Sequence, residues 1–145
     1  MSRFLIGFVL CTSFVLAGSS LAAASSKFAY TEELQFPGGS LVVAFEEAGQ
    51  KKYDSVDYRL DATVVVTSCQ DPDHCVASIS DVSSSVADLV PEAKGGRVAG
   101  SVALTPGSGG GCGCLSIHLD YTNVTLTNVT SGRVYVLDPI SGDAP

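Results

Sequence analysis

Five cysteines are the residues of this chain best suited to covalent or metal chemistry. Cys69 and Cys75 are separated by five residues, Cys112 and Cys114 enclose a single glycine, and Cys11 lies in an apolar run near the N-terminus. Four thiolates can hold zinc or cuprous copper tetrahedrally, and paired thiols can also exchange electrons through a disulfide. The four later cysteines therefore predict structural disulfides, a metal site or a thiol-redox site.

We expect structural disulfides, because the spacing differs from the Cys-x2-Cys knuckle common in zinc sites. A bridge between Cys112 and Cys114 is sterically awkward, since disulfides favour Cα separations of ~5.5 Å. We therefore expect each member of the first pair, Cys69 and Cys75, to bond with one member of the second, each bridge contributing ~3–4 kcal/mol. The alternative connectivity joins the cysteines within each pair.

A metal-binding or thiol-redox protein is the second function that the sequence suggests. The four-cysteine cluster would supply the ligands, and His74, which directly precedes Cys75, is a further candidate ligand. The metal-binding or thiol-redox function is the alternative to structural disulfides. With disulfides, we expect no bound cofactor.

A third possibility, an extracellular hydrolase, arises from Ser116, His118 and Asp120, which alternate along one predicted strand. Same-face neighbours on a strand lie ~7 Å apart, and the chain lacks the Gly-x-Ser-x-Gly elbow that exposes a nucleophilic serine. These residues are better explained as the polar face of a strand, so we expect no catalytic residue.

Two Asn-x-Thr sequons occur close together, at Asn123 and Asn128. In a eukaryotic secretory pathway both asparagines could carry glycans. Asn-Val-Thr is also an ordinary composition for a β-strand, so glycosylation is expected only if the source is eukaryotic.

Residues 1–24 have the layout of a secretory signal peptide, with Arg3, an apolar run and small residues before the predicted cleavage site between Ala24 and Ser25. Cleavage would remove Cys11 and leave an even number of cysteines, as is typical of an oxidised exported domain. It would also change the net charge from −7 to −8, because it removes one Arg and no acid. We expect a secreted, extracellular or periplasmic protein with no membrane span in the mature chain.

Apolar residues alternate with polar ones through most of the remaining chain. The longest run extends over residues 55–67 and predicts a long strand with one buried face, to which Tyr58 contributes. Residues 81–93 are ambiguous between helix and strand, with strand slightly favoured, and a change of parity predicts a bulge near Thr122 or Asn123. The expected organisation is a lead-in segment (25–39), an all-β domain (40–138) and a loose tail (139–145).

This pattern predicts an all-β fold of seven or eight strands, arranged as an antiparallel β-sandwich or, alternatively, a small β-barrel. The chain has 145 residues, 46% of them hydrophobic, which excludes a disordered acidic protein. Its eight Lys and Arg are scattered apart from the Lys51–Lys52 pair, which argues against nucleic-acid binding. We expect a non-catalytic binding or structural domain whose partner is a protein, a glycan or a second copy of itself.

Overall fold

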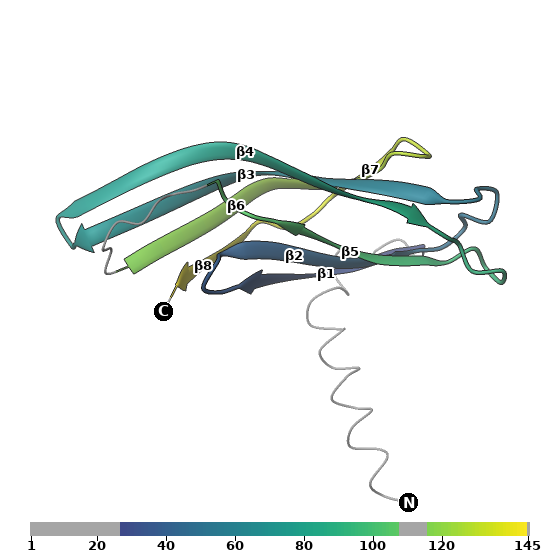
Figure 1. Cartoon of the computed structure of the whole chain (residues 1–145), viewed down its shortest axis with the longest axis horizontal. Coiled ribbons are helices and arrows are strands. Elements are labelled where there is room, and N and C mark those ends of the chain that lie inside the picture. The colour runs from purple at the N-terminus through teal and green to yellow at the C-terminus, as the bar shows by residue number, and fades with distance from the viewer. Residues whose placement is uncertain (1–26, 108–115, 145) are drawn as a thin grey trace, which may run out of the picture.

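The computed structural model describes residues 27–107 and 116–144, which form eight strands in two antiparallel sheets (Figure 1). The smaller sheet has the order β1-β2-β5. The larger has the order β4-β3-β6-β7, with β8 also pairing with β6. The predicted antiparallel sandwich is confirmed. The strands are β1 (Phe28–Gln35), β2 (Ser40–Glu47), β3 (Val56–Asp71), β4 (His74–Leu89), β5 (Val98–Leu104), β6 (Ser116–Asn128), β7 (Arg133–Val136) and β8 (Ile140–Ala144).

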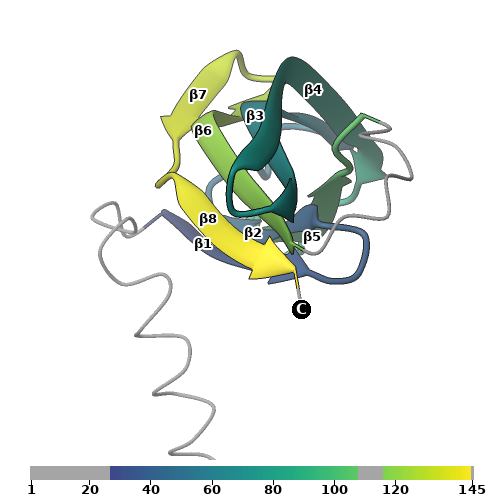
Figure 2. The same cartoon turned by 90° about the vertical axis from the view of Figure 1, so that its left-hand side faces the viewer.

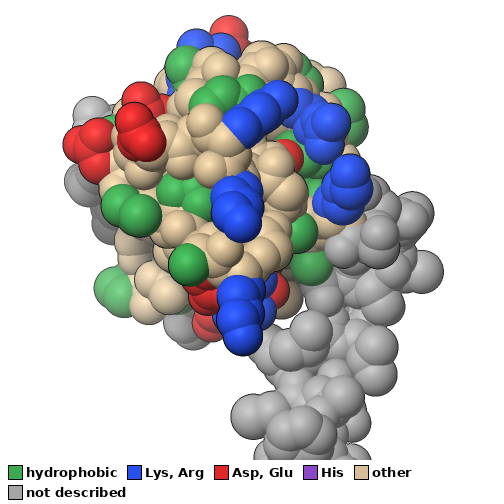
Figure 3. All heavy atoms as spheres, turned by 90° about the vertical axis from the view of Figure 1, so that its right-hand side faces the viewer, with side chains coloured by type: hydrophobic (Ala, Val, Ile, Leu, Met, Phe, Trp, Pro, Cys, Tyr) green, Lys and Arg blue, Asp and Glu red, His purple; other side chains and the backbone are tan. Residues whose placement is uncertain are grey.

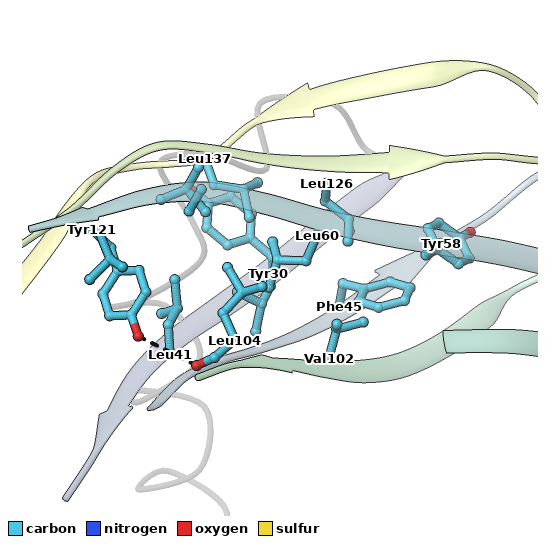
Figure 4. Packing of buried hydrophobic residues seen from close by; sticks show 14 of the residues in the cluster. Tyr30, Leu41, Phe45, Tyr58, Leu60, Val102, Leu104, Tyr121, Leu126 and Leu137 are labelled. Carbon is cyan, nitrogen blue, oxygen red and sulfur yellow. Dashed lines mark hydrogen bonds between the residues drawn. The ribbon is translucent and has the colours of Figure 1, made fainter. Parts of the chain in front are cut away.

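The core lies between the two sheets and consists of the inward-facing residues of each strand. In β3 every second residue from Val56 to Val66 is buried, as the alternation in the sequence predicts, and Tyr58 is fully enclosed. Figure 4 shows Leu60 and Leu126 of the larger sheet packing toward Phe45 and Val102 of the smaller one. Burial of this alternating apolar face is the main force that holds the two sheets together.

Seen end-on, the two sheets surround the core, because their edges approach each other on both sides (Figure 2). Strand β5 lies next to the end of β4 on one side, and β1 lies next to β8 on the other. A Cβ atom added at Gly100 of β5 would lie 2.7 Å from Leu89 Cδ1 of β4, so a glycine is needed where these strands meet.

The predicted irregularity in β6 is confirmed at Asn123. Asp61 pairs with Thr125 whereas Thr63 pairs with Thr122, so β6 contains one more residue than β3 over this stretch. Asn123 has a φ of 51°, a left-handed conformation that asparagine tolerates better than most residues. This bulge shifts the inward face of β6 from Leu119 and Tyr121 to Val124 and Leu126.

Two segments that the sequence placed outside the β domain are strands of it. β1, within the predicted lead-in segment, pairs with β2 along its whole length. The prediction of a loose tail after residue 138 is wrong, because β8 pairs with β6 from Ile140 to Ala144. The ambiguous segment 81–93 is extended up to Leu89 and continues the strand that begins at His74.

The described part of the chain contains no helix that is long and apolar enough to cross a membrane. The predicted signal peptide, residues 1–24, lies outside the described residues, as do Cys112 and Cys114.

Candidate binding surface

The first pair of cysteines forms a disulfide within one hairpin. Cys69 and Cys75 face each other across β3 and β4, with their Cα atoms 4.1 Å apart, and their sulfur atoms are bonded. The expected cross-pairing with the second pair is therefore wrong, because the tight turn between β3 and β4 brings these two side chains together directly. The bond also removes two thiolates from the four that the predicted metal site would need.

His74 is exposed next to this disulfide and contacts a carboxylate. Its Nδ1 lies 2.7 Å from Asp71 Oδ1 at the start of the turn, and Asp73 N donates a hydrogen bond to the same oxygen over 2.9 Å. Among the described residues no group of three or more His, Cys, Asp or Glu side chains could hold a metal ion. The contact between His74 and Asp71 thus stabilises the turn between β3 and β4.

Ser116, His118 and Asp120 share one face of β6, as predicted, but His118 is paired with carboxylates through both ring nitrogens. Nδ1 lies 2.6 Å from Asp143 Oδ1 of β8, and Nε2 lies 3.3 Å from Asp120 Oδ2. The hydrogen bond to Asp143 is the main cause that raises the pKa of His118 above its usual range. Neither nitrogen is left to accept a proton from Ser116, so this group links β6 to β8 rather than forming a triad.

The two sequon asparagines lie in different environments. Asn123 is exposed at the bulge, and a glycan there remains a prediction for a eukaryotic source. Asn128 is fully buried, and its amide nitrogen donates hydrogen bonds to Glu47 and Gln50. A glycan on Asn128 is incompatible with this fold, which corrects the expectation from the sequence.

The most unusual side chain in the core is Glu47, a fully buried carboxylate at the end of β2. Its Oε2 accepts hydrogen bonds from the Tyr58 hydroxyl over 2.7 Å and from Asn128 Nδ2 over 2.9 Å, and its Oε1 accepts one from the Tyr135 hydroxyl. Arg133 Nη1 lies 3.9 Å from Oε1. A buried carboxylate is tolerated only when donors replace the water it has lost, and here Tyr58, Asn128 and Tyr135 do so, with the Arg133 guanidinium as a nearby positive charge.

The tyrosines of this cluster are held in their hydroxyl form. Burial, together with the nearby Glu47 carboxylate, raises the pKa of Tyr135 to about 12 and raises that of Tyr58 further. The Tyr135 ring also stacks on Phe28 of β1 with centroids 3.7 Å apart. Both hydroxyls therefore remain hydrogen-bond donors throughout the physiological pH range.

This network fixes the loops at one end of the sandwich, here called the loop end, which comprises residues 48–55, 90–97 and 129–132. Gln50 Oε1 accepts a hydrogen bond from Asn128 Nδ2, and the Gly49 and Gln50 amides donate to the Gly95 and Gly96 carbonyls over 2.9 Å each. Gly96 has a φ of +61°, and a Cβ atom there would lie 2.4 Å from the Lys51 nitrogen. The first two loops therefore pack backbone against backbone, and the third is tied to them through Asn128.

The loop end gathers nearly all of the cations of the described chain. Figure 3 shows Lys and Arg side chains spread over this end, with hydrophobic side chains between them. Of the seven described Lys and Arg only Arg59 lies elsewhere; the others are Lys27, Lys51, Lys52, Lys94, Arg97 and Arg133. Arg97 pairs with Glu46 and Glu92, but Lys51, Lys52 and Lys94 lie in no ion pair within the described ranges.

No protein-family model matches the chain, and no curated protein is detectably similar to it in sequence. The assignment of a function therefore depends on the geometry of the chain itself.

Neither the buried carboxylate nor the cationic end was predicted from the sequence, although the sequence contains a signal for the carboxylate. Leu41, Val43 and Phe45 alternate inward along β2, and Glu47 continues the same parity. Asn128 likewise follows Val124 and Leu126 on the inward face of β6. A polar residue at an inward position predicts a buried polar network. The cationic end left no such signal, because its residues are far apart in the chain.

Proposed function

We propose that the protein is an exported, non-catalytic binding module whose loop end contacts a partner rich in anionic groups. The observation that carries this proposal is that Lys51, Lys52 and Lys94 lie on two loops joined by backbone hydrogen bonds and form no ion pair with a carboxylate of the described residues. Because the loop backbone is already fixed, little backbone entropy is lost when these lysines bind an anion. The Cys69–Cys75 disulfide supports export, because disulfides persist in oxidising compartments.

The distribution of charge favours an end-on approach. In the larger sheet, the half nearest the turn at residues 72–73 has no Lys or Arg among its described residues, and its carboxylates are Asp71, Asp73, Asp81, Asp120 and Asp143. β3 has 16 residues and is therefore roughly 50 Å long, several times the ~8 Å screening length at physiological salt. A partner that meets only the loop end thus avoids repulsion from the acidic half.

Exposed apolar side chains of the same loop end add to this surface. Val90 and Val129 are 74% and 51% exposed and flank the start of β3, since Leu89 pairs with Val56 and Val129 N donates to Asp57 O. Exposed apolar groups among cations suit an anionic surface that also offers apolar contact. The net negative charge of −7 remains our reason for expecting no nucleic-acid partner. The scatter of the cations along the sequence no longer supports that expectation, because the fold gathers them at one end.

The test is binding of the purified protein to two anionic probes, each with a neutral counterpart. The first is vesicles containing phosphatidylglycerol, compared with vesicles of phosphatidylcholine alone, and the second is dextran sulfate, compared with dextran. Combined replacement of Lys51, Lys52 and Lys94 by Ala should weaken binding to the anionic probe roughly 100-fold, at ~1 kcal/mol for each lysine.

A matched control lowers the net charge by the same amount away from the loop end. Gln35→Glu, Gln70→Glu and Ser141→Glu are exposed positions outside it, and this triple variant should bind like the wild-type protein. Binding to vesicles alone or to dextran sulfate alone would identify the source of the anionic groups. Equal loss in both triple variants, or no binding to either probe, would refute the proposal.

A further inference from the structure

Strand β4 is an edge of the larger sheet and pairs with β3 alone among the described strands. From Val76 to Val86 its register with β3 is regular, and the register shifts lie outside this stretch, at Cys69/Asp71 and Val56/Tyr58. The backbone groups that point away from β3 here have no strand partner in the described residues. A regular edge of this kind is a template for pairing with another strand.

The features that usually prevent such pairing are missing between Val76 and Val86. This stretch contains no Lys, Arg or Pro, and its only charged residue is Asp81. The Asp81 carboxylate accepts a hydrogen bond from Thr63 Oγ1 over 2.9 Å, so it is directed toward β3 rather than out from the edge. Val76 and Ile79, which lie on opposite faces of the strand, are each 72% exposed. Apart from Asp81 the edge is thus uncharged, it is extended, and it has no second strand partner among the described residues.

We propose that two copies of this chain pair through β4, edge to edge and antiparallel, so that their larger sheets form one continuous sheet. The partner is a second copy because charge is polarised along the strand direction. The half of the larger sheet nearest the turn at residues 72–73 has carboxylates and no Lys or Arg among its described residues, whereas at the other end Lys51, Lys52 and Lys94 accompany the carboxylates Asp54, Asp57, Asp88 and Glu92. Antiparallel pairing places the acidic half of one copy beside the half of the other that contains the cations.

A parallel arrangement would instead set the two acidic halves side by side, at a cost in repulsion. Antiparallel pairing over the regular stretch gives a contact roughly 35 Å long, with main-chain hydrogen bonds along it. A two-fold axis through the contact makes it self-complementary and closed, so the assembly stops at two copies. The β4 edge is separate from the loop end, so a substitution on the edge and the replacement of the three lysines test the two proposals separately.

Sedimentation equilibrium of protein purified from an exporting host tests the proposal. The wild-type mass should rise from one chain to two as concentration increases. Ile79→Lys places a charge on the edge and should raise the dimer dissociation constant at least about tenfold. Val136→Lys is the matched control, because Val136 is 79% exposed on β7, on the opposite side of the larger sheet, and it should dimerise like the wild type.

Hydrogen exchange of the wild-type protein provides a measurement that needs no variant. Amides of β4 between Val76 and Val86 should exchange more slowly as concentration rises, whereas those of β7 should not change. A mass of one chain at all concentrations up to millimolar would overturn the proposal. So would a dimer that Ile79→Lys leaves intact, or one whose concentration-dependent protection lies outside β4.

Discussion

Replacing Tyr58 by Phe tests whether Glu47 acts as a charged acceptor that stabilises the fold. The substitution removes one hydroxyl, 2.7 Å from Glu47 Oε2, and keeps a ring that is fully buried and packs 4.4 Å from the Phe45 centroid. Packing is therefore retained, and the loss is that of one hydrogen bond. A hydrogen bond to a charged group contributes ~1.5–3 kcal/mol to the free energy of unfolding.

Tyr121 provides the matched control, because it is also a fully buried tyrosine. Its hydroxyl donates to the Gly39 carbonyl over 2.8 Å and more weakly to the Leu104 carbonyl over 3.4 Å, the latter drawn in Figure 4. These acceptors are uncharged, so Tyr121→Phe should cost only ~0.5–1.5 kcal/mol. The two variants remove the same atom from similar burial and differ in the charge of the acceptor.

Urea unfolding at neutral pH, followed by tyrosine fluorescence, measures both costs, and thermal unfolding should show a shift of about 4 °C for each kcal/mol. Combining Tyr58→Phe with Glu47→Gln should cost less than the sum of the single changes, because both remove the same interaction. Equal costs for Tyr58→Phe and Tyr121→Phe, or additivity in the double variant, would refute the role assigned to Glu47.

Three further predictions concern the loop packing, the disulfide and the pH dependence of stability. Gly96→Ala should cost more than about 3 kcal/mol in urea unfolding, because its Cβ would meet the Lys51 backbone, whereas Gly132→Ala, with a φ of +80° and open space around it, should cost about 1 kcal/mol. Replacing Cys69 and Cys75 together by Ser should lower stability by about 2 kcal/mol, as expected for so short a loop. Burial and the nearby Asp138 raise the pKa of Glu32 from 4.5 to about 7, so stability should fall as pH rises through this interval, and Glu32→Gln should remove the fall.

Each of these predictions has an outcome that would contradict it. Similar costs at Gly96 and Gly132 would mean that the loops do not pack backbone against backbone. Titration of four free thiols in the unfolded, unreduced protein would contradict the Cys69–Cys75 bond. For the pH profile the control is Glu33→Gln, an exposed neighbour that changes the net charge equally. If Glu33→Gln flattened the profile as much as Glu32→Gln, the effect would be one of net charge.

Local patterns predicted the parts of the fold that depend on neighbours in the chain. Alternation along residues 55–67 identified the longest apolar strand face and placed Tyr58 in the core, and the change of parity after Tyr121 located the bulge at Asn123. The same rule, applied to Glu47 and Asn128, would have predicted the buried network. Alternation is informative because side chains of a strand point alternately to opposite faces, whatever the strand pairs with.

Predictions from residue composition and spacing were wrong where the structure depends on which strands or cysteines pair. The tail at residues 139–145 is short and contains Pro, Gly and Asp, which is typical of a loop, yet β6 offers it an open edge and it pairs there as β8. The disulfide connectivity could not be read from spacing either. The turn at residues 72–73 sets the register that places Cys69 opposite Cys75, and that register is a property of the folded hairpin.

The sequence by itself therefore determined the class of fold, its long strands and the bulge, since all of these follow from residue types and their spacing, and it predicts an oxidised, exported chain. Only the tertiary structure decided that Cys69 bonds with Cys75, that Glu47 is enclosed by two tyrosines and an asparagine, that the lysines of separate loops share one end, and that β4 is an edge with one partner among the described strands. The physical reason is that strands bring together residues far apart in the chain. Charge, hydrogen bonding and edge exposure depend on which strands become neighbours.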